Sequence, residues 1–414
     1  MNSKDRRVSR TEKLEFPTVK IQEGSTTVVI PLLHHSEGSD IQRLRSQAPV
    51  FYNPQMSLNR DTAVLALSAH QRRLSRPVSA CEPMCGSGVR GVRLALEVEG
   101  LEHVTMGDLS PSATRLASIN AAANGVSDRV TVRTMGAHQL LSLHARPLQR
   151  FDYVDVDPYG SPSPFLDTAM RSCKKGGLLA LTATDMAPLC GVYRRACLRK
   201  YGGVPLRTEY CHGLALRLLV GSLVTTAARH EVAVKPVFSY AADHYVRVYV
   251  TLDRGSRKAD ACLGEMGYMR HCFTCLHREA VKRESILDSR DCNHCGSRME
   301  MAGPLWLGEL AETSFCDDML ECSERSILSS NVRLVEMIRL VRGEVGLPPG
   351  YYNIDLVCSK LRVASTPVNG VLDALRREGY VATMSHIDNR GIKTDADAST
   401  LLKIVSDHVK GGTG

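Results

Sequence analysis

The sequence predicts an open α/β fold, in which helices cover both faces of a parallel sheet, followed by a cysteine-rich insert and an α+β region. Strand and helix patterns alternate through the first half of the 414-residue chain, which is typical of parallel strands joined by crossover helices. Two Cys-x-x-Cys pairs then stand close together, and short helix patterns precede a hairpin near the C-terminus. A chain of this length accommodates two or three domains.

The composition is that of a globular protein with a moderate positive charge. Hydrophobic residues make up 43% and charged residues 23%, and the formal net charge of +8 suits an acidic polymer as partner without identifying one. No apolar stretch follows the polar residues 1–10, so the sequence shows no secretory signal. Fourteen cysteines in a chain of this size favour reduced thiols and a metal site over a disulfide framework. We therefore expect a cytoplasmic protein.

The first elements expected are a strand pair at residues 19–33, which turns at Glu23-Gly24. Five strands then form the expected parallel sheet, and they are Val78–Cys81, Val104–Met106, Val130–Arg133, Tyr153–Val156 and Leu178–Thr182. The helices predicted around them are Val89–Glu97, Pro111–Asn120 and His212–Arg229. The apolar part of the last helix, Leu214–Ala228, contains Arg217 and is too short and polar to span a bilayer, so we expect a core helix and no membrane partner.

Two further strands close the sheet. Lys235–Tyr240 and His244–Leu252 are separated by only a few residues, which predicts an antiparallel pair. In the second strand, valines alternate with Tyr245, Arg247 and Tyr249, so the two sets should lie on opposite faces of the sheet.

The chain after the sheet is interpreted as a separate part. The charged stretch Asp253–Ala259 is expected to be a linker, which divides the chain into an N-terminal domain, residues 1–258, and a C-terminal domain, residues 259–414. Within the second domain, two short helices and a hairpin resemble a winged helix over about residues 325–410. These elements are Val357–Val363, Pro367–Arg377 and Tyr380–Thr394.

The turn after the first strand of the sheet is rich in glycine. In Glu82-Pro-Met-Cys-Gly86-Ser-Gly88-Val-Arg-Gly91, glycines allow a tight turn and close approach to a ligand, although helix–strand packing also explains them. Asp108 ends the next strand, where a carboxylate can accept from both hydroxyls of a ribose or simply cap the following helix. A nicotinamide dinucleotide fits both signals. However, an acid at position 82 would repel a pyrophosphate and suits the amino group of a methionine moiety, which favours a methyltransferase.

The strongest motif, Asp155-Val-Asp157-Pro158-Tyr159-Gly160-Ser161-Pro162, follows an apolar strand at the sheet edge where ligands bind. An acid-Pro-aromatic sequence at this point resembles the motif of amine-directed methyltransferases. Because an aromatic amine is a poor nucleophile, a carboxylate that accepts its hydrogens can aim it and take a proton as charge develops. The aromatic ring supports a flipped base by stacking. The alternative is an ordinary strand-terminating turn.

The two cysteine pairs have the spacing of a four-thiolate zinc ribbon within about residues 262–300. Because four thiolates leave no open position, we expect a structural zinc ion bound by Cys272, Cys275, Cys292 and Cys295. The neighbouring histidines are interpreted as solvated, and they are His271, His277 and His294. The surrounding cations suit either contact with an RNA backbone or a solvated charged loop, and they are Arg270, Arg278, Lys282 and Arg283.

A basic segment lies downstream of the catalytic motif, between Tyr193 and Tyr201. Its cations suit phosphates and its tyrosines suit splayed bases, while the alternative is an ordinary surface helix. The expected RNA-binding residues are Arg194, Arg195, Arg199 and Lys200.

The chain resembles the tRNA (guanine-26-N2)-dimethyltransferase family from about Val19 to about Lys393. The motifs that carry the resemblance are Val50-Phe51-Tyr52-Asn53-Pro54, Leu58-Asn59-Arg60-Asp61, Gly88-Val-Arg-Gly91, Asp157-Pro-Tyr-Gly-Ser-Pro162, Thr182-Ala-Thr-Asp185, Ala187-Pro-Leu-Cys-Gly191 and Gly303-Pro-Leu-Trp-Leu-Gly308. The resemblance implies a Rossmann-like class I methyltransferase sheet, a C-terminal domain particular to the family, and S-adenosylmethionine as cofactor. It also implies two successive methyl transfers to N2 of one guanine in tRNA.

The resemblance implies roles for individual residues. Asp157 is expected to be the catalytic acid/base, with Phe51 and Tyr159 on either side of the guanine; many relatives have Phe where Tyr159 stands. Relatives tend to carry an acid at Met135-Gly136-Ala137, so here the backbone of Ala137 is the expected adenine contact. Arg60 is expected near the carboxylate of the cofactor. Together with the glycine-rich turn, the expected cofactor-binding residues are Arg60, Glu82, Gly86, Gly88, Arg90, Asp108, Ala137 and Asp157.

Two other functions stay open. A non-catalytic tRNA-binding chaperone would use the zinc and winged-helix parts, but it would not need the cofactor residues, which are all present. Another amine-directed enzyme, acting on adenine in DNA, usually has two prolines before its aromatic residue, whereas Asp157-Pro158-Tyr159 has one. The oligomeric state is open, with a monomer expected.

Overall fold

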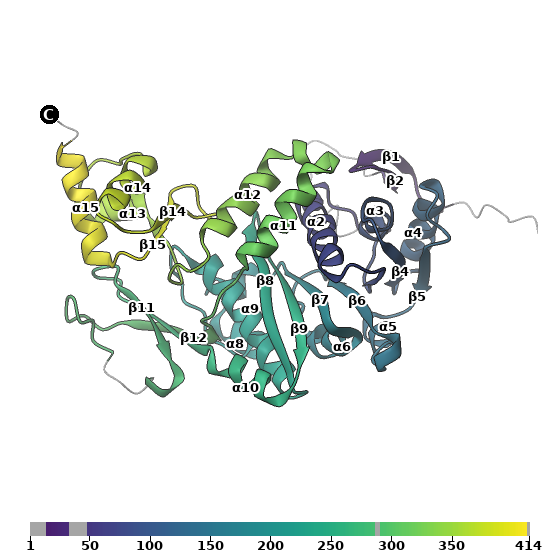
Figure 1. Ribbon diagram of the computed structural model, residues 1–414, viewed down its shortest axis with the longest axis horizontal. Helices are drawn as coiled ribbons and strands as arrows, with labels where there is room; N and C mark the ends of the chain where they lie inside the picture. The colour runs from purple at the N-terminus through teal and green to yellow at the C-terminus, as the bar shows by residue number, and fades with distance from the viewer. Residues whose placement is uncertain (1–13, 33–47, 286–289, 412–414) are drawn as a thin grey trace, which may run out of the picture.

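Seven strands form the central sheet of the computed structural model, which describes residues 14–32, 48–285 and 290–411 (Figure 1). Their order is β5-β4-β3-β6-β7-β9-β8. The strands from β5 to β7 in this order run parallel, and β9 is antiparallel to both its neighbours, as predicted. They are β3 (Val78–Glu82), β4 (Leu101–Asp108), β5 (Val130–Thr134), β6 (Phe151–Val156), β7 (Cys173–Ala183), β8 (Val232–Ala242) and β9 (Tyr245–Arg254).

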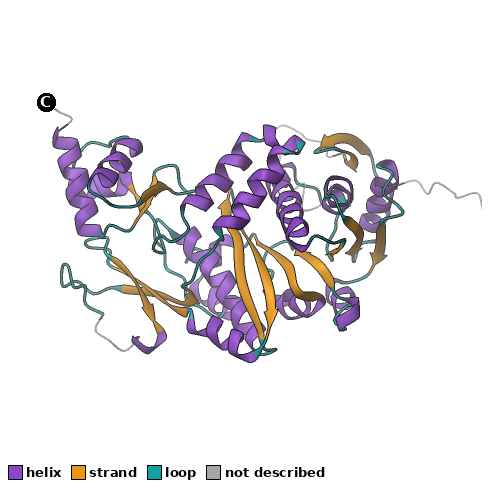
Figure 2. Ribbon diagram, viewed as in Figure 1, coloured by secondary structure: helices purple, strands orange, loops and turns teal. Residues whose placement is uncertain are grey.

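Helices cover both faces of this sheet (Figure 2). They are α2 (Ser57–Leu74), α3 (Val89–Glu97), α4 (Pro111–Ala123), α5 (Ala137–Leu143), α6 (Leu166–Ser172), α7 (Met186–Leu189), α8 (Arg194–Tyr201) and α9 (Cys211–Ala228). The predicted α/β fold class is therefore confirmed, and α3 begins and ends at the predicted residues.

The strand β9 shows how the two faces are built. Val246 and Val248 lie in a core cluster with α9, whereas Tyr245 and Tyr249 lie in a second cluster with α2 and α3. This confirms the predicted alternation. It also places the buried Arg247 on the tyrosine face, below the strand ends that carry the candidate site.

The helix α9 is long and apolar enough to cross a membrane, the one such helix in the described residues, but 67% of its most apolar window is buried. It packs between β8 and the later strand β12 (Glu300–Trp306). Its Arg217 donates to the carbonyls of Trp306 (3.0 Å) and Gly308 (2.9 Å). α9 is thus a core helix, as predicted.

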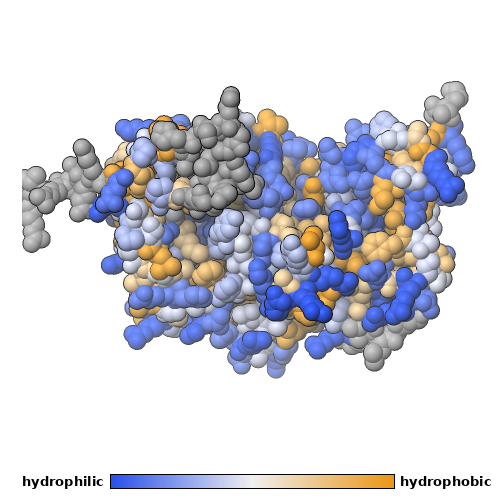
Figure 3. Space-filling model, turned by 180° about the vertical axis from the view of Figure 1, so that it is seen from behind, coloured by the Kyte–Doolittle hydropathy of each residue, from blue (hydrophilic) through white to orange (hydrophobic). Residues whose placement is uncertain are grey.

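On the face seen from behind, hydrophobic and hydrophilic residues are interspersed in small patches (Figure 3).

An antiparallel pair, β1 (Thr18–Glu23) and β2 (Thr26–Pro31), precedes the sheet as predicted. It turns through Gly24, whose φ of +57° favours glycine. Glu23 at the turn is buried and forms ion pairs with Arg60 of α2 and Arg93 of α3. The hairpin is therefore fastened to α2 and to α3, the helix that follows the glycine-rich turn.

The prediction of a linker at residues 253–259 is wrong. These residues complete β9 and begin α10 (Ser256–Gly264), which packs on β8 and α9. A three-stranded sheet of order β11-β10-β12 follows, formed by β10 (Met266–His271), β11 (Arg278–Lys282) and β12. Since β12 packs on α9 and α11 (Thr313–Glu324) packs on α2, the later part of the chain shares its core with the earlier part. The exact division into two domains stays a prediction.

The C-terminal region confirms the predicted order of two helices and a hairpin. Its elements are α12 (Val332–Gly343), β13 (Tyr352–Asn353), α13 (Ile354–Leu361), α14 (Val368–Arg377), β14 (Ala382–Met384), β15 (Gly391–Thr394) and α15 (Ala398–Gly411). The strands pair in the order β13-β15-β14. Apolar residues of α13, α14 and α15 form a separate core cluster, which we call the winged-region core, and Val357, Leu375 and Leu401 are among them.

A buried acid joins α12 to the hairpin of this region. Glu344 accepts from the backbone N–H and the ring Nδ1 of His386, both at 2.7 Å, and lies 3.3 Å from Nζ of Lys393. Burial opposes ionisation of Glu344, but His386 and Lys393 outweigh it and lower its pKa to about 2. Because this pKa is lower than in the unfolded chain, the ionised group stabilises the fold above about pH 4.5 and loses this effect as the pH falls toward 2.

We therefore expect E344Q to lower the free energy of unfolding by about 3 kcal/mol near neutral pH, because it leaves His386 and Lys393 without their buried partner. The gap between wild type and variant should narrow when urea unfolding is repeated at about pH 3. The exposed Glu336 on α12 supplies the control, E336Q, which should change neither value. A gap of equal size at both pH values would contradict this account.

Candidate active site and zinc site

Asp157 lies at the carboxyl edge of the sheet, directly after β6. Its side chain is 17% exposed, and Nη2 of Arg90 donates to its Oδ2. No other hydrogen-bond partner of this carboxylate is found among the described residues. The loop that follows is held from the next strand end, because the N–H of Gly160 donates to Oγ1 of Thr184 (2.8 Å). Asp157 is thus fixed through one oxygen, while its Oδ1 has no partner among these residues.

Arg90, near the start of α3, is the centre of a buried polar network. Its Nη1 donates to Oδ1 of Asn59 (2.8 Å) and to Oδ2 of Asp155 (3.0 Å), and its Nε lies 3.2 Å from Oε1 of Glu82. The side chain is 5% exposed. These contacts make Arg90 a residue that orients Asp157, and its expected contact with the cofactor stays a prediction.

A second buried arginine, Arg247, completes the network and is absent from the residues that the sequence assigns to the site. It donates to both oxygens of Asp155, from Nη2 at 2.6 Å and from Nη1 at 3.1 Å, and both side chains are fully buried. Burial alone would raise the pKa of Asp155, yet Arg247 and Arg90 hold it below its ordinary value. The available signal was a cation in the middle of a buried strand, which requires an acidic partner without saying which one.

The glycine-rich turn lies against both Phe51 and Asp108. Gly86 has a φ of +52°, and a Cβ built on it would lie 3.1 Å from the carbonyl oxygen of Phe51. Its N–H donates to Oδ2 of Asp108 (2.9 Å), and the N–H of Ser110 donates to Oδ1 (2.9 Å). Ser110, and not Asp108, is the residue that caps α4. The carboxylate of Asp108 is therefore held in place beside a stretch of bare backbone.

Gly88 has a packing role. A Cβ built on it would lie 2.6 Å from Cβ of Ala117 in α4, and its φ is +75°. A larger side chain would push α4 away from the turn. The alternative that this glycine serves helix packing thus has direct support, and its contact with a cofactor stays a prediction.

Glu82, at the end of β3, is 5% exposed. Its Oε2 accepts from the N–H of Gly91 at 3.0 Å. Burial raises the pKa of Glu82 to about 8 even though Arg90 opposes the shift. The acid at the entrance of the turn is therefore a buried group tied to the start of α3.

Two further residues expected at the cofactor are also buried. Arg60 binds Glu23, with Nη2 2.7 Å from Oε2, and donates to the carbonyl of Asn53 (3.1 Å). Its charge is thus balanced by the hairpin residue. Ala137 is the first residue of α5 and is 8% exposed, so its backbone N–H lies at a helix N-terminus.

The two aromatic residues expected to enclose the guanine are both exposed. Phe51 is 47% exposed and Tyr159 is 88% exposed, so neither side chain is packed in the core. Their ring faces are therefore available to a stacked base.

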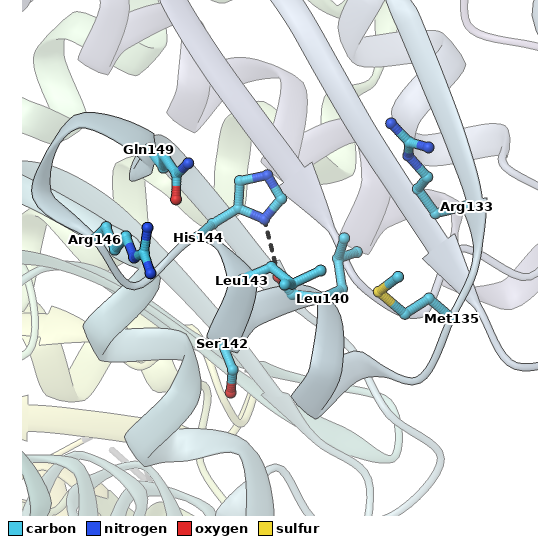
Figure 4. A pocket seen from close by; sticks show the side chains of 8 residues that line it. All are labelled: Arg133, Met135, Leu140, Ser142, Leu143, His144, Arg146 and Gln149. Carbon is cyan, nitrogen blue, oxygen red and sulfur yellow. Dashed lines mark hydrogen bonds between the residues drawn. The ribbon is translucent and has the colours of Figure 1, made fainter.

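A cavity of about 680 Å³ lies beside β5 and α5 (Figure 4). In the close-up, Arg133 and Met135 lie on one side of it, and Arg146 and Gln149 lie on the other beside His144. None of the predicted site residues lines this cavity. Its Met135 stands two residues before Ala137, the expected adenine contact, so the cavity lies next to one end of the candidate cofactor site.

The helix α8 presents the predicted RNA-binding cations to solvent. Arg194, Arg195 and Arg199 are exposed, and Tyr193 before them is 62% exposed. Lys200 is also exposed, but its Nζ lies 2.8 Å from Oδ2 of Asp185, which partly balances its charge. The second tyrosine of the segment, at position 201, is buried. Contact of this helix with RNA stays a prediction.

The four predicted zinc ligands come together. Sγ of Cys272 lies 3.4 Å from Sγ of Cys295, and Sγ of Cys275 lies 3.5 Å from Sγ of Cys292; all four atoms lie within 4.8 Å of one another. A tetrahedral zinc with bonds of about 2.3 Å needs sulfur atoms about 3.8 Å apart. The four cysteines therefore fit a structural zinc ion.

The two knuckles also share one backbone form. The N–H of Leu276 donates to the carbonyl of Cys272 (2.9 Å), and the N–H of Gly296 donates to that of Cys292 (2.8 Å). Leu276 and Gly296 have φ angles of +65° and +69°. Each cysteine pair is thus held by the same tight turn.

Several residues around the knuckles differ from their prediction as solvated or RNA-contacting groups. His271 is buried against Tyr210 and Phe273, although His294 is exposed as predicted. Arg270 is buried and pairs with Glu279. Because Arg270 and His271 are neighbours in β10, their side chains leave opposite faces of the small sheet, and both are buried.

Arg278 is likewise buried and joins three parts of the chain. It pairs with Glu209 at 2.8 Å, lies over the ring of Tyr352 at 3.8 Å, and donates to the carbonyl of Tyr351. Of the four cations predicted around the zinc knuckles, only Lys282 and Arg283 are exposed. Arg278 therefore fastens β11 to the winged region.

We expect C292S to lose one equivalent of zinc per chain, because serine is a poor zinc ligand and the small ribbon depends on the metal for its fold. Protease cleavage between β10 and β12 should become faster. Elemental analysis and limited proteolysis measure the two effects. The control is C262S, which replaces a partly buried cysteine of α10 outside the cluster. Full zinc content in C292S would contradict the assignment.

Comparison with known proteins extends over nearly the whole chain. The family described as TRM, N2,N2-dimethylguanosine tRNA methyltransferase, matches residues 26–406. A tRNA (guanine(26)-N(2))-dimethyltransferase of Methanothermobacter thermautotrophicus is 38% identical over 388 residues, covering 94% of this chain and 98% of the relative. A tRNA (guanine(26)-N(2)/guanine(27)-N(2))-dimethyltransferase of Aquifex aeolicus is 34% identical, covering 88% and 93%.

A solved structure shows the same arrangement. The complex of Trm1 from Pyrococcus horikoshii with S-adenosyl-L-methionine superposes with a TM-score of 0.80 at 32% identity, covering 93% of this chain and 99% of that one. Given this likeness in fold, and a family match that spans the sheet, the site and the ribbon, the chain belongs to the N2,N2-dimethylguanosine tRNA methyltransferase family.

Proposed function

We propose that this chain transfers two methyl groups in succession from S-adenosylmethionine to the exocyclic N2 of the guanine at position 26 of tRNA. The observation that carries the proposal is the carboxylate of Asp157, held by Arg90 at the carboxyl edge of the sheet in the motif that also presents the exposed Tyr159. Relatives above 30% identity over nearly the whole chain are named for this activity.

The sheet edge fits the cofactor. Each oxygen of Asp108 accepts one backbone N–H, which leaves lone pairs for the two hydroxyls of a ribose. Gly86 keeps the neighbouring backbone bare, and the N–H of Ala137 lies at a helix N-terminus suited to an adenine nitrogen. Arg60, which lies at the start of α2 and pairs with Glu23, is the residue proposed to lie near the carboxylate of the cofactor. When bound, S-adenosylmethionine supplies a methyl group already activated by its sulfonium.

The work of the protein is then to align the amine and to accept its protons. Because Arg90 holds Oδ2 of Asp157, Oδ1 is aimed at a fixed point and can accept a hydrogen of the guanine N2. The amine gives up one proton at each transfer, and the same carboxylate can take both in turn. Phe51 and Tyr159 hold the base plane by stacking on its two faces.

The remaining expectations belong to the same proposal. The exposed cations of α8 suit the phosphates of tRNA. A cytoplasmic location and a monomeric state agree with such an enzyme. No contact among the described residues favours the chaperone or the DNA-directed alternative.

Incubation with labelled S-adenosylmethionine and a tRNA transcript tests the proposal, followed by mass spectrometry of the nucleosides. We expect mono- and then dimethylguanosine, and no product with a matched transcript that has adenine at position 26. Methylation of that second transcript at a neighbouring guanine would extend the specificity to position 27, as the name of the Aquifex aeolicus relative has it. A transcript that stays unmethylated in both forms would overturn the proposal.

A further inference from the structure

A second group of metal-ligating side chains lies apart from the zinc ribbon. Cys190, Cys211 and His212 place two sulfur atoms and one ring nitrogen within 4.8 Å of one another. Sγ of Cys211 lies 3.8 Å from Nδ1 of His212. All three side chains are partly exposed, so an ion from solution can reach them.

The fold brings these residues together from two segments. Cys190 directly follows α7, and Cys211 and His212 are the first residues of α9. Gly191 makes the approach possible, because its φ is +92° and a Cβ built on it would lie only 3.0 Å from the backbone nitrogen of Arg207. The loop after α7 therefore passes directly against the segment that leads into α9.

The position of Cys211 favours a thiolate ligand. It stands in the first turn of an 18-residue helix, where unpaired N–H groups and the helix dipole stabilise negative charge. The thiolate is the form of cysteine that binds metals, and a helix N-terminus favours this form. Cys190 and His212 add a second sulfur and an imidazole, which together form a ligand set that zinc prefers.

We infer that Cys190, Cys211 and His212 bind a second zinc ion. Tetrahedral zinc with bonds of about 2.3 Å to sulfur and about 2.0 Å to nitrogen needs a sulfur and a nitrogen ligand about 3.5 Å apart. The observed 3.8 Å between Cys211 and His212 is close to that value. No fourth side chain joins the group in the parts of the chain that the structure describes, so a water molecule completes the coordination.

The ion would brace the loop behind the candidate catalytic motif. At the start of this loop, Thr184 accepts from Gly160, and Asp185 accepts from the hydroxyl of Tyr201 at 2.5 Å. That hydroxyl in turn accepts from Ser161 at 2.8 Å. Zinc at Cys190 would fasten the far end of the same loop to α9, which is fixed in the core. Binding of this ion does not depend on the proposed methyl transfer.

Zinc content per chain tests the inference. We expect two equivalents in the purified wild-type chain, one in C190S, one in C211S, one in C292S, and none in the double variant C190S/C292S. The control C197S, which replaces a buried cysteine of α8 outside both groups, should keep two equivalents of zinc. A wild-type chain with one equivalent that C292S abolishes would overturn the inference. So would a wild-type mass lower by two hydrogens that becomes normal in C190S, since this indicates a Cys190–Cys211 disulfide.

Cobalt substitution in the wild-type chain gives a readout that does not depend on how well a variant folds. A four-thiolate site and a site with two thiolates and one imidazole differ in the intensity and position of their absorption bands. We expect titration with Co²⁺ to produce both spectra, and C190S to retain only the four-thiolate one. Saturation of the wild type at one equivalent with a pure four-thiolate spectrum would leave the second site without support and reject it.

Discussion

Replacing Asp157 with asparagine is expected to slow methyl transfer by about 10²- to 10⁴-fold, the usual contribution of a positioned acid/base. Asparagine keeps the shape of the side chain but cannot take the proton that the guanine N2 releases, and its amide can turn an N–H toward Arg90. The rate should be measured in a single turnover with enzyme in excess over labelled tRNA, so that product release does not enter. Both the first and the second methylation should slow, because one carboxylate serves both.

The matched control is D260N, which alters an exposed aspartate of α10 and should leave the rate unchanged. Thermal stabilisation by S-adenosylmethionine should be measured on D157N as well: a retained shift assigns the loss of rate to the chemistry, and a lost shift assigns it to the expected contact of Asp157 with the cofactor. A variant that keeps more than a tenth of the wild-type rate would remove Asp157 from its proposed role and leave the alignment of the two reactants as the main source of the rate.

The largest effect on stability is expected for D155N. The carboxylate of Asp155 is fully buried between Arg247 and Arg90, so the substitution leaves two buried cations with one formal charge fewer to balance them. Breaking a buried pair in this way costs about 3 to 5 kcal/mol. The free energy of unfolding from urea titration, followed by circular dichroism, measures the loss directly.

The comparison for this variant is D253N, whose carboxylate pairs with lysines at the surface. Exposed pairs contribute little, so D253N should unfold at the same urea concentration as the wild type. If D155N and D253N behaved alike, the network around Arg90 would not be a source of stability, and the orientation of Asp157 would need another explanation.

Much of the sheet and its edge could be predicted from local patterns. The alternation in β9 predicted its two faces, since the period of two depends only on strand geometry. The position of Asp157 and Asp108 at one edge could be predicted because the first follows an apolar strand, the second ends one, and parallel strands end on the same edge. The convergence of the four cysteines could be predicted because a knuckle is defined by spacing within a few residues.

The partners of buried charges could not be predicted. Glu23 and Arg60 are far apart in sequence, and nothing local says that the hairpin closes over α2. The same holds for Arg247 and Asp155. The stretch 253–259 was mistaken for a linker because it is charged, although Gly255 and the residues after it begin a helix whose polar face meets solvent. The burial of His271 could not be predicted either, because the register of β10 is set by its pairing with β12, which lies far along the chain.

Leu276 belongs to the first zinc knuckle, yet its side chain is buried in the winged-region core with Tyr352 and Ile354. The boundary of that module in space is therefore not a boundary in sequence. A fragment that begins at about residue 325 would lack one of its own apolar core residues, and its exposed face would invite aggregation. Expression of this module for separate study requires the ribbon, with its metal, on the same polypeptide.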